Sequence, residues 1–300
     1  MPQQVAIPEQ PRLCVPFDEL VEFVADVFFA RGLAPSRARL AAEALCYGEA
    51  TVGKDYGLAG LKRTYLPLLD CGLARAQAEP LVIADRGAAV LVDYRRALGL
   101  WAVSDAMDRA VSRAGRHGVA VVSLRGVTDF GRAGHHAARA VPSGMIGLVL
   151  AAGGEQNPAR HGVNPLGFAA PAGPYPSFVF DLDATALSTG AAGFVLLVEV
   201  LAGLLPGVAD HDHDTGLMVM AIAPATLRSA DGFYRHASAL FGSLLGWESG
   251  APDRYPGWRE AQRMEQCEAM GVPLAAKLYR ELAEIGKQLG LRMPAAVGER

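Results

Sequence analysis

Apolar residues recur every three to four positions in several segments of the chain, which is the spacing of an amphipathic helix. The predicted helices cover residues 17–31, 35–45, 62–69 and 100–116, and two more lie within 257–289, broken near Gly271. The first helix ends at Gly32, and the second begins at Pro35 with Ser36 as a candidate cap. An apolar run over residues 194–205 predicts a further, buried helix, because about a dozen residues are too few to cross a bilayer.

Short apolar runs punctuated by Gly and Pro predict strands between these helices. The runs cover residues 89–93, 119–124, 145–151, 167–170, 178–181 and 217–223. Runs that stay apolar at nearly every position are typical of strands buried on both faces. Helices at both ends of the chain and strands in its middle predict an α/β fold.

Composition narrows the classes of partner and compartment. The chain has 300 residues, of which 51% are hydrophobic, so it can bury a large core. A net charge of −3 gives no reason to expect nucleic acid or an anionic membrane as a partner. The four cysteines show no metal-binding spacing, which suits a reducing compartment, and the N-terminus lacks the features of a secretion signal. We therefore expect a cytoplasmic protein with no bound metal.

Residues 41–73 carry the most informative motif, an Ala-rich helical stretch followed by Asp55, Tyr56 and Gly57. This stretch resembles the type-2 malate/L-lactate dehydrogenase family, which also includes sulfolactate, ureidoglycolate and cyclic-imine reductases. That family has an acidic position, then Ser-His-Gly, then an Arg four residues after the His. The His is its acid/base. In this chain Tyr56 stands at the His position and Gly60 at the Arg position, so the proton donor and the carboxylate clamp are both replaced.

Five later segments resemble the same family in the same order. They are residues 118–154, 162–167, 178–185, 193–207 and 255–291. In the first of them Asp129 replaces a family His, while Asp181 is retained in the third. The resemblance implies the family's non-Rossmann fold, a central mixed sheet with flanking N- and C-terminal helices, assembled as a homodimer. Residues 1–86 and 255–300 would form the dimerisation surface and cleft wall, and residues 87–254 the central α/β domain.

The segment that holds the nicotinamide cofactor in the family is largely missing. Roughly forty residues with Lys and a Gly-rich turn are expected after the strand that contains Asp181, but the apolar helix follows almost at once. Residues 163–208 contain no Lys or Arg, and no GxGxxG motif is present. A dinucleotide pyrophosphate needs cations, oriented backbone N–H groups, or both. We therefore expect no cofactor and assign no cofactor-binding residue.

Four residues at family cleft positions are the candidate catalytic groups: Tyr56, Asp129, His135 and Asp181. A phenol with an ordinary pKa near 10 can donate a proton to a developing oxyanion, so Tyr56 is the expected proton donor. His135 or Asp129 is the expected base. The alternatives are structural: Tyr56 fills the space of the lost imidazole, Asp129 caps a helix, and Asp181 is solvated at a strand end.

The remaining candidates are expected to contact substrate. They are Asp55, Lys62, Arg63, His136, Asn164 and Asp183. Lys62 or Arg63 would offset a substrate carboxylate in place of the missing clamp, whereas a solvated helix face explains them equally well. The run from Asp210 to Asp214 alternates Asp and His, but a short, flexible loop rarely preorganises a metal site, so no metal is assigned.

Three functions are compatible with this sequence. The first is a divergent enzyme that keeps the family cleft and carries out cofactor-independent isomerisation, elimination or cyclisation of a small 2-oxo, imino or amino-acid-like substrate, with specialised metabolism as one setting. The second is an NAD(P)H-dependent reductase of a 2-oxo acid or cyclic imine. The third is a non-catalytic binding or scaffold protein. Polar groups persist at the cleft positions, which favours an enzyme.

Overall fold

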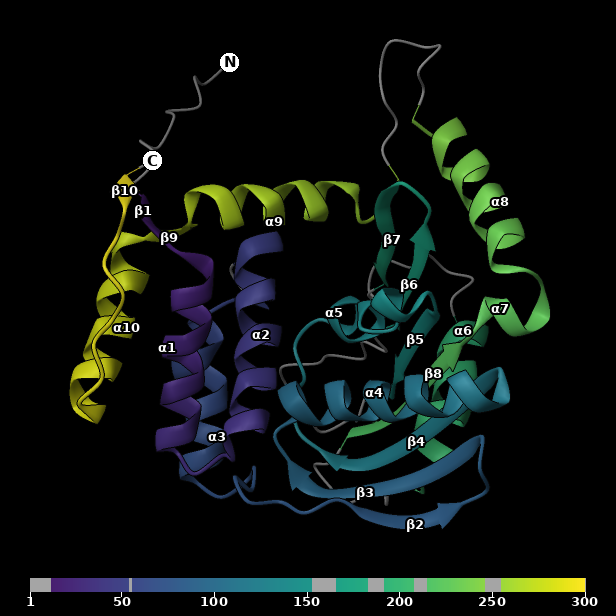
Figure 1. Cartoon of the computed structure of the whole chain (residues 1–300). Coiled ribbons are helices and arrows are strands. Elements are labelled where there is room, and N and C mark those ends of the chain that lie inside the picture. The colour runs from purple at the N-terminus through teal and green to yellow at the C-terminus, as the bar shows by residue number, and fades with distance from the viewer. Residues whose placement is uncertain are drawn as a thin grey trace, which may run out of the picture.

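The computed structural model of the chain describes residues 12–53, 56–152, 166–182, 192–207, 215–245 and 255–299. A seven-stranded mixed sheet lies beside a helical part that is built from both ends of the chain (Figure 1). The expected α/β fold, with a central mixed sheet and flanking N- and C-terminal helices, is therefore confirmed.

The helical part begins with α1 (Phe17–Ala30) and α2 (Pro35–Thr51), which pack against each other. Pro35 suits the first position of α2 because an N–H there has no helical partner to lose. No side chain caps this helix, so the expectation that Ser36 caps it is wrong. α2 continues beyond residue 45 and ends just before Gly53, whose φ of +71° is unfavourable for other residues.

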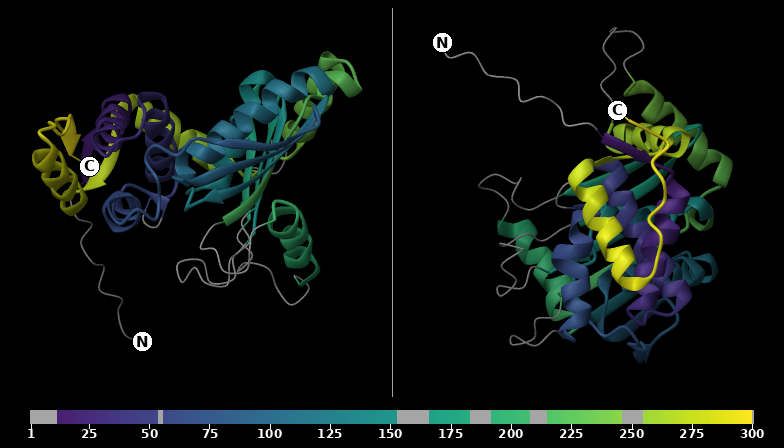
Figure 2. Two further views of the ribbon diagram at one scale, coloured as in Figure 1. Left: turned by 90° about the horizontal axis from the view of Figure 1, so that it is seen from below. Right: turned by 90° about the vertical axis from the view of Figure 1, so that its left-hand side faces the viewer.

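The C-terminal segment returns to these N-terminal helices and holds them together. It consists of α9 (Trp258–Met270), β9 (Val272–Ala275), α10 (Ala276–Leu289) and β10 (Gly298–Glu299). β1 (Arg12–Val15) pairs antiparallel with both β9 and β10, so the two ends of the chain share a small sheet (Figure 2). The expected break between two helices near Gly271 is therefore a strand, too short for its pattern to be recognised.

The large sheet has the strand order β2-β3-β4-β8-β5-β6-β7. Its strands are β2 (Leu81–Asp85), β3 (Ala89–Ala97), β4 (Val119–Val127), β5 (Ile146–Ala151), β6 (Leu166–Ala172), β7 (Tyr175–Leu182) and β8 (Thr215–Ile222). β3 and β4 run parallel and are connected by α4 (Gly99–His117); the other neighbouring pairs are antiparallel.

Helices cover both faces of this sheet. Leu217 and Val219 on β8 belong to the main core, in which α4 packs on the sheet. Met218, between them, points to the other face and packs with Val198 and Ala202. These two residues lie on α6 (Ala192–Val198) and the π-helical turn after it (Glu199–Leu204), and Figure 2 shows α4 and α6 on opposite sides of the sheet.

The segment that contains α6 is less buried than its sequence suggests. Five of its large apolar side chains are at least half exposed: Leu196, Leu197, Val200, Leu204 and Leu205. The expectation of a buried helix over residues 194–205 is therefore wrong for the single chain. No helix in the described ranges is both long and apolar enough to cross a membrane.

Further helices and turns lie between these elements. They include the π-helical turn Leu61–Tyr65, α3 (Leu66–Asp70), α5 (Ala133–Ala138), the 3₁₀ turn Val141–Ser143, α7 (Pro224–Leu227) and α8 (Ala230–Ser243). α8 has no counterpart among the predicted helices. It begins where the Ser229 hydroxyl accepts a hydrogen bond from the Gly232 N–H at 3.2 Å.

Candidate active site

The end of α2 and the turn after it fix the position of Tyr56. A Cβ on Gly48 would collide with the Tyr56 carbonyl oxygen, so the turn lies directly on the helix. Glu49 accepts a hydrogen bond from the Leu58 N–H at 2.8 Å, and burial raises the pKa of its carboxyl. A Cβ on Gly57 would collide with the same carboxylate. Glycines at positions 48 and 57 therefore allow a close approach that leaves Tyr56 42% exposed.

Arg132 connects Tyr56 to Asp181. Its guanidinium lies 6.0 Å from the centre of the Tyr56 ring, and its Nη2 donates to Asp181 Oδ2 at 2.5 Å. The other Asp181 oxygen accepts the Gly134 N–H, so this carboxylate on β7 also satisfies a donor in the first turn of α5. A side chain on Gly134 would displace the carboxylate, because its Cβ would lie 2.5 Å from Asp181 Oδ2.

His135 follows Gly134, whose N–H binds Asp181, and its ring lies against Tyr47 of α2. The His135 and Tyr47 rings are 5.0 Å apart. Burial holds the pKa of His135 well below its usual value, and the charges of His136, Arg139 and Arg132 lower it further, so its ring is neutral at pH 7. Burial also raises the pKa of Tyr47 to about 12, so this phenol keeps its proton.

His136 points into the core instead. Its Nδ1 lies 2.9 Å from the Ser104 hydroxyl and its Nε2 lies 2.7 Å from the Phe130 carbonyl oxygen. The residue is fully buried, and this burial lowers the pKa of its ring to about 4. Both ring nitrogens of His136 are therefore engaged within the fold, which disagrees with its expected contact to substrate.

Asp129 belongs to a second group of residues. Its Oδ1 accepts hydrogen bonds from the Tyr65 hydroxyl at 2.7 Å and the Gly131 N–H at 3.0 Å. Tyr65 ends the π-helical turn Leu61–Tyr65, and a Cβ on Gly60 would lie 3.0 Å from its ring. The Tyr65 ring thus fills the space beside Gly60. The alternative in which Asp129 caps a helix is therefore not observed, since its bond to Gly131 lies in the turn before α5.

The other expected site residues are exposed or not described. Lys62 and Arg63 are exposed on the π-helical turn. Asp55, Asn164, Asp183 and the run from Asp210 to Asp214 lie outside the described residues. Within the described ranges, no three His, Cys, Asp or Glu side chains are grouped closely enough to hold a metal ion.

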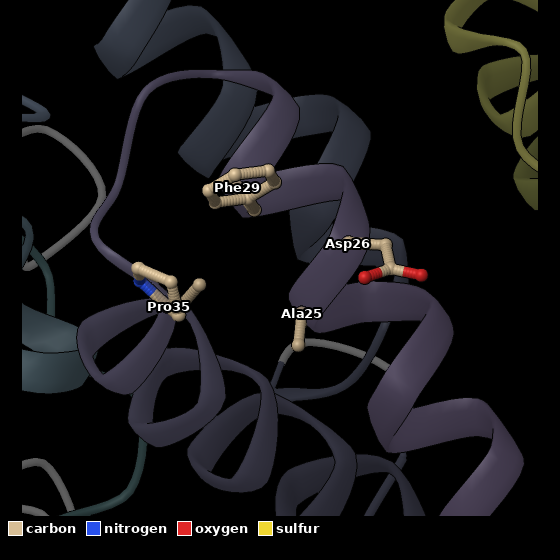
Figure 3. A pocket seen from close by; sticks show the side chains of 5 residues that line it. Ala25, Asp26, Phe29 and Pro35 are labelled. Carbon is tan, nitrogen blue, oxygen red and sulfur yellow. The ribbon is translucent and has the colours of Figure 1, made fainter.

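Two hollows lie away from these residues. One, of about 270 Å³, lies between α1 and α2 and is lined by Ala25, Asp26, Phe29, Pro35 and Ala38 (Figure 3). The other, of about 680 Å³, is lined by four residues of α8, namely Asp231, Tyr234, Arg235 and Ser238. None of the candidate site residues lines either hollow.

The sequence of this site and its scaffold matches a known family. The family model described as malate/L-lactate dehydrogenase matches residues 15–193, more than half of the chain. The chain belongs to the malate/L-lactate dehydrogenase family. Within this family of oxidoreductases it is divergent, since it is only 31% and 28% identical to the two relatives described next.

Curated relatives in the family match only part of their own length. A 2,3-diketo-L-gulonate reductase from Citrobacter koseri is 31% identical over 196 residues, which cover 63% of this chain and 57% of the relative. A malate dehydrogenase from Pyrococcus abyssi is 28% identical over 184 residues, 59% of this chain and 50% of the relative. The chain thus matches about half the length of these relatives.

Solved structures confirm the family fold along almost the whole chain. A malate dehydrogenase from Pyrococcus horikoshii OT3 superposes with a TM-score of 0.84 at 20% identity. The superposition covers 97% of this chain and 99% of that one. The fold is therefore retained beyond residue 193, where the sequence match ends.

The sequence did not predict two residues that lie among these candidates. Arg132 and Tyr47 lie outside the motif positions that define the family resemblance. A charged residue in the turn before a helix was a usable signal for Arg132, because binding residues commonly lie on such connecting segments. Tyr47 had no such signal, since an aromatic residue inside an apolar helix is usually part of the core.

Proposed function

We propose that this family member is an enzyme that moves protons on a small 2-oxo, imino or amino-acid-like substrate. The reaction would be an isomerisation, elimination or cyclisation that uses no nicotinamide cofactor. The observation that carries the proposal is the arrangement of Tyr56, Arg132 and Asp181, in which a partly exposed phenol lies against an ion pair. This arrangement replaces the family's imidazole and leaves groups that carry protons and charge.

Each side chain has a distinct part in this chemistry. Tyr56 donates a proton to the oxyanion that forms as the substrate carbonyl is polarised, and the positive charge of Arg132 stabilises that oxyanion. His135 is the proton acceptor, because its ring is neutral and can hold one more proton. Its lowered pKa makes it a weak base, so removal of a carbon-bound proton depends on Tyr56 and Arg132 stabilising the oxyanion that forms. Asp181 orients Arg132.

The residues after β7 do not fit a nicotinamide dinucleotide. Residues 163–208 contain no Lys or Arg to pair with a pyrophosphate. Arg125 reaches this region from β4, but its guanidinium is engaged by Asp93 and by the carbonyl oxygens of Pro206 and Gly207. The end of the family match at residue 193 agrees with a segment that has changed its use.

An NAD(P)H-dependent reductase is the second candidate. Family membership favours it, and one relative is named as a reductase of 2,3-diketo-L-gulonate. In that case a bound nicotinamide would supply the hydride, Tyr56 would supply the proton to the substrate oxygen or nitrogen, and a 2-oxo acid or cyclic imine would be the substrate.

We also propose a homodimer, in which the exposed apolar side chains of α6 and its π-helical turn are covered. Residues 1–86 and 255–300 would supply further dimer surface and one wall of the cleft, with residues 87–254 as the central domain. Five large apolar side chains are exposed on neighbouring turns of this segment. Large contiguous apolar patches are uncommon on the surface of monomers and often mark an interface.

Proton exchange with solvent separates these functions. The protein is incubated in D₂O with 2-oxobutyrate or another 2-oxo acid, without nicotinamide, and deuterium at C3 is followed by NMR against a protein-free control. Catalysed exchange without cofactor is expected. If the same acids are instead reduced when NADH or NADPH is added, and no exchange occurs without it, the reductase is correct. A protein that does neither with any acid is not this kind of enzyme.

A titration with NADH and NADPH tests the cofactor directly. We expect weak binding or none, because the segment after β7 lacks cations. A dissociation constant in the low micromolar range or below would contradict the proposal and favour the reductase.

A further inference from the structure

We infer that Arg132 binds the carboxylate of the substrate, and so takes the part that the Arg at the Gly60 position has in the family. This inference rests on the proposed function, because it names the substrate class of the same site. It assigns the substrate a single carboxylate next to the reacting 2-oxo or imino carbon.

The first observation is that Arg132 has an unused donor inside the protein. Its side chain is only 11% exposed, and its Nη2 is bonded to Asp181. Its Nη1 is buried and has no hydrogen-bond partner among the described residues. A buried charged donor without a partner is unfavourable, and a ligand oxygen would satisfy it. The planar guanidinium presents its donors as a fork, so Nη1 can take a second carboxylate while Nη2 keeps the first.

A second buried polar atom, on His135, also lacks a hydrogen-bond partner in the part of the chain that the structure describes. His135 Nε2 is buried and has no partner among the described residues. It comes three positions after Arg132, at the start of α5, and its ring lies against Tyr47. The charges of Arg132 and Asp181 both act on the Tyr47 phenol, which places all four groups in one neighbourhood. A substrate seated here would meet one cation, one imidazole and one phenol.

The Gly60 position, where the family has its carboxylate-binding Arg, offers no such site. The Tyr65 ring occupies the space beside Gly60, and Tyr65 is itself bonded to Asp129. Lys62 and Arg63 on the same turn are exposed to water, where an ion pair with a substrate contributes little. The cation that receives the carboxylate has therefore moved from this turn to the start of α5.

Charge favours a carboxylate over a doubly charged anion. Arg132 and Asp181 together carry no net charge, so a bound carboxylate leaves one negative charge at the site. A phosphate dianion would place two negative charges beside the Asp181 carboxylate, which repels them. The site therefore fits a small monocarboxylate such as a 2-oxo acid.

The test measures binding rather than turnover. Pyruvate, 2-oxobutyrate and L-proline are titrated into the full chain by calorimetry or NMR, with pyruvamide as the uncharged counterpart of pyruvate. We expect the acids to bind and pyruvamide to bind much less. Arg132→Gln should weaken binding of the acids roughly ten- to a hundredfold, since it removes a charge-assisted hydrogen bond. Arg139→Gln is the matched control, because Arg139 ends the same helix and pairs with Asp108 on the surface.

Two more variants keep the test independent of folding. The double variant Arg132→Gln, Asp181→Asn removes both charges together. It should fold, and it should still fail to bind the acids. Asp181→Asn alone removes the competing carboxylate, so it should bind the acids several-fold more tightly. Equal binding by wild type and Arg132→Gln, or no binding of any acid to the wild type, overturns the inference. Arg132-dependent binding without catalysed deuterium exchange supports the inference and contradicts the proposed function.

Discussion

The exchange of an imidazole for a phenol at position 56 changes which proton transfers are possible. An imidazole both accepts and donates protons near pH 7, whereas a phenol with an ordinary pKa near 10 mainly donates. The guanidinium of Arg132 near the Tyr56 ring adds a positive charge where negative charge would develop. A site of this kind needs a separate acceptor, and His135 is the described side chain that can serve.

Removal of one hydroxyl tests the role of Tyr56. Tyr56→Phe should lower the rate of catalysed deuterium exchange by roughly two to four orders of magnitude, because the general acid is lost. Tyr234→Phe is the control, since Tyr234 is partly exposed on α8 and lines the hollow there. Circular dichroism confirms folding of both variants. A Tyr56→Phe variant that retains the wild-type rate would show that another group donates the proton.

The buried His136 predicts a dependence of stability on pH. Burial lowers the pKa of its ring to about 4 in the folded chain, against about 6.5 when unfolded. The unfolded chain therefore binds the proton first, and stability falls as the pH drops from 6.5 to 4. The loss attributable to this ring is on the order of 3 kcal/mol.

Urea unfolding at pH values between 4 and 7 measures this loss. His136→Asn should make the decline shallower, because one of the two buried rings is removed while His135 remains. His236→Asn should follow the wild type, since His236 is exposed on α8. If the decline is equally steep in His136→Asn, other groups control it.

At this scale, the sequence proposes positions for the site, and the partners of those residues could not be predicted from it. The family motif places Tyr56, Asp181 and His135, and the structure brings their neighbourhoods together through Arg132 and Tyr47. Which residue pairs with a carboxylate depends on contacts between segments far apart in sequence, such as Arg132 and Asp181. Periodicity and motifs carry no information on those contacts.

The fit between α2 and the following turn shows how one helix controls the site. A Cβ on Gly48 would meet the carbonyl oxygen of Tyr56, so any larger residue must push the turn away. Gly115 in α4 is also in a helix, but the nearest atom to its added Cβ is Met145 Cε at 3.8 Å, an ordinary contact. Gly48 and Gly115 therefore form a matched pair of helical glycines for substitution by alanine.

Gly48→Ala should destabilise the chain by about 1–3 kcal/mol and lower catalysed exchange, because overpacking moves Tyr56. Gly115→Ala should instead stabilise the chain by about 0.5–1 kcal/mol, since alanine is the better helix former where space is available. Thermal and urea unfolding measure both changes. A Gly48→Ala variant as stable and active as the wild type would show that the turn can shift without consequence.

Elements with strong periodicity were predicted well, and those that depend on tertiary contacts were not. The helices α1 and α4 and strands β3 and β4 lie where their patterns indicate. β2 was missed although its sequence LVIAD is apolar at four of five positions, and all five of its residues are exposed in the single chain. β9 has only four residues, and its partner β1 lies at the other end of the chain.

The exposed apolar surface of α6 and its π-helical turn leads to a prediction for the whole molecule. Sedimentation at micromolar concentration should show a dimer. Leu196→Lys with Leu204→Lys should shift it towards monomer, because burying two ammonium groups is unfavourable. Leu227→Lys is the control, since Leu227 on α7 is 81% exposed and lies outside this surface. A wild-type monomer would leave the exposed leucines without this explanation.

The position of β8 in the sheet has a consequence for how the chain is synthesised. β8 pairs with β4 on one side and with β5 on the other, yet it leaves the ribosome after β5, β6, β7 and α6. Until residue 222 has emerged, the nascent chain can form only two separate half-sheets, and β4 and β5 each present an unpaired edge. Completion of the sheet therefore waits for a late strand that joins its two halves, and a chaperone would be most useful during that interval.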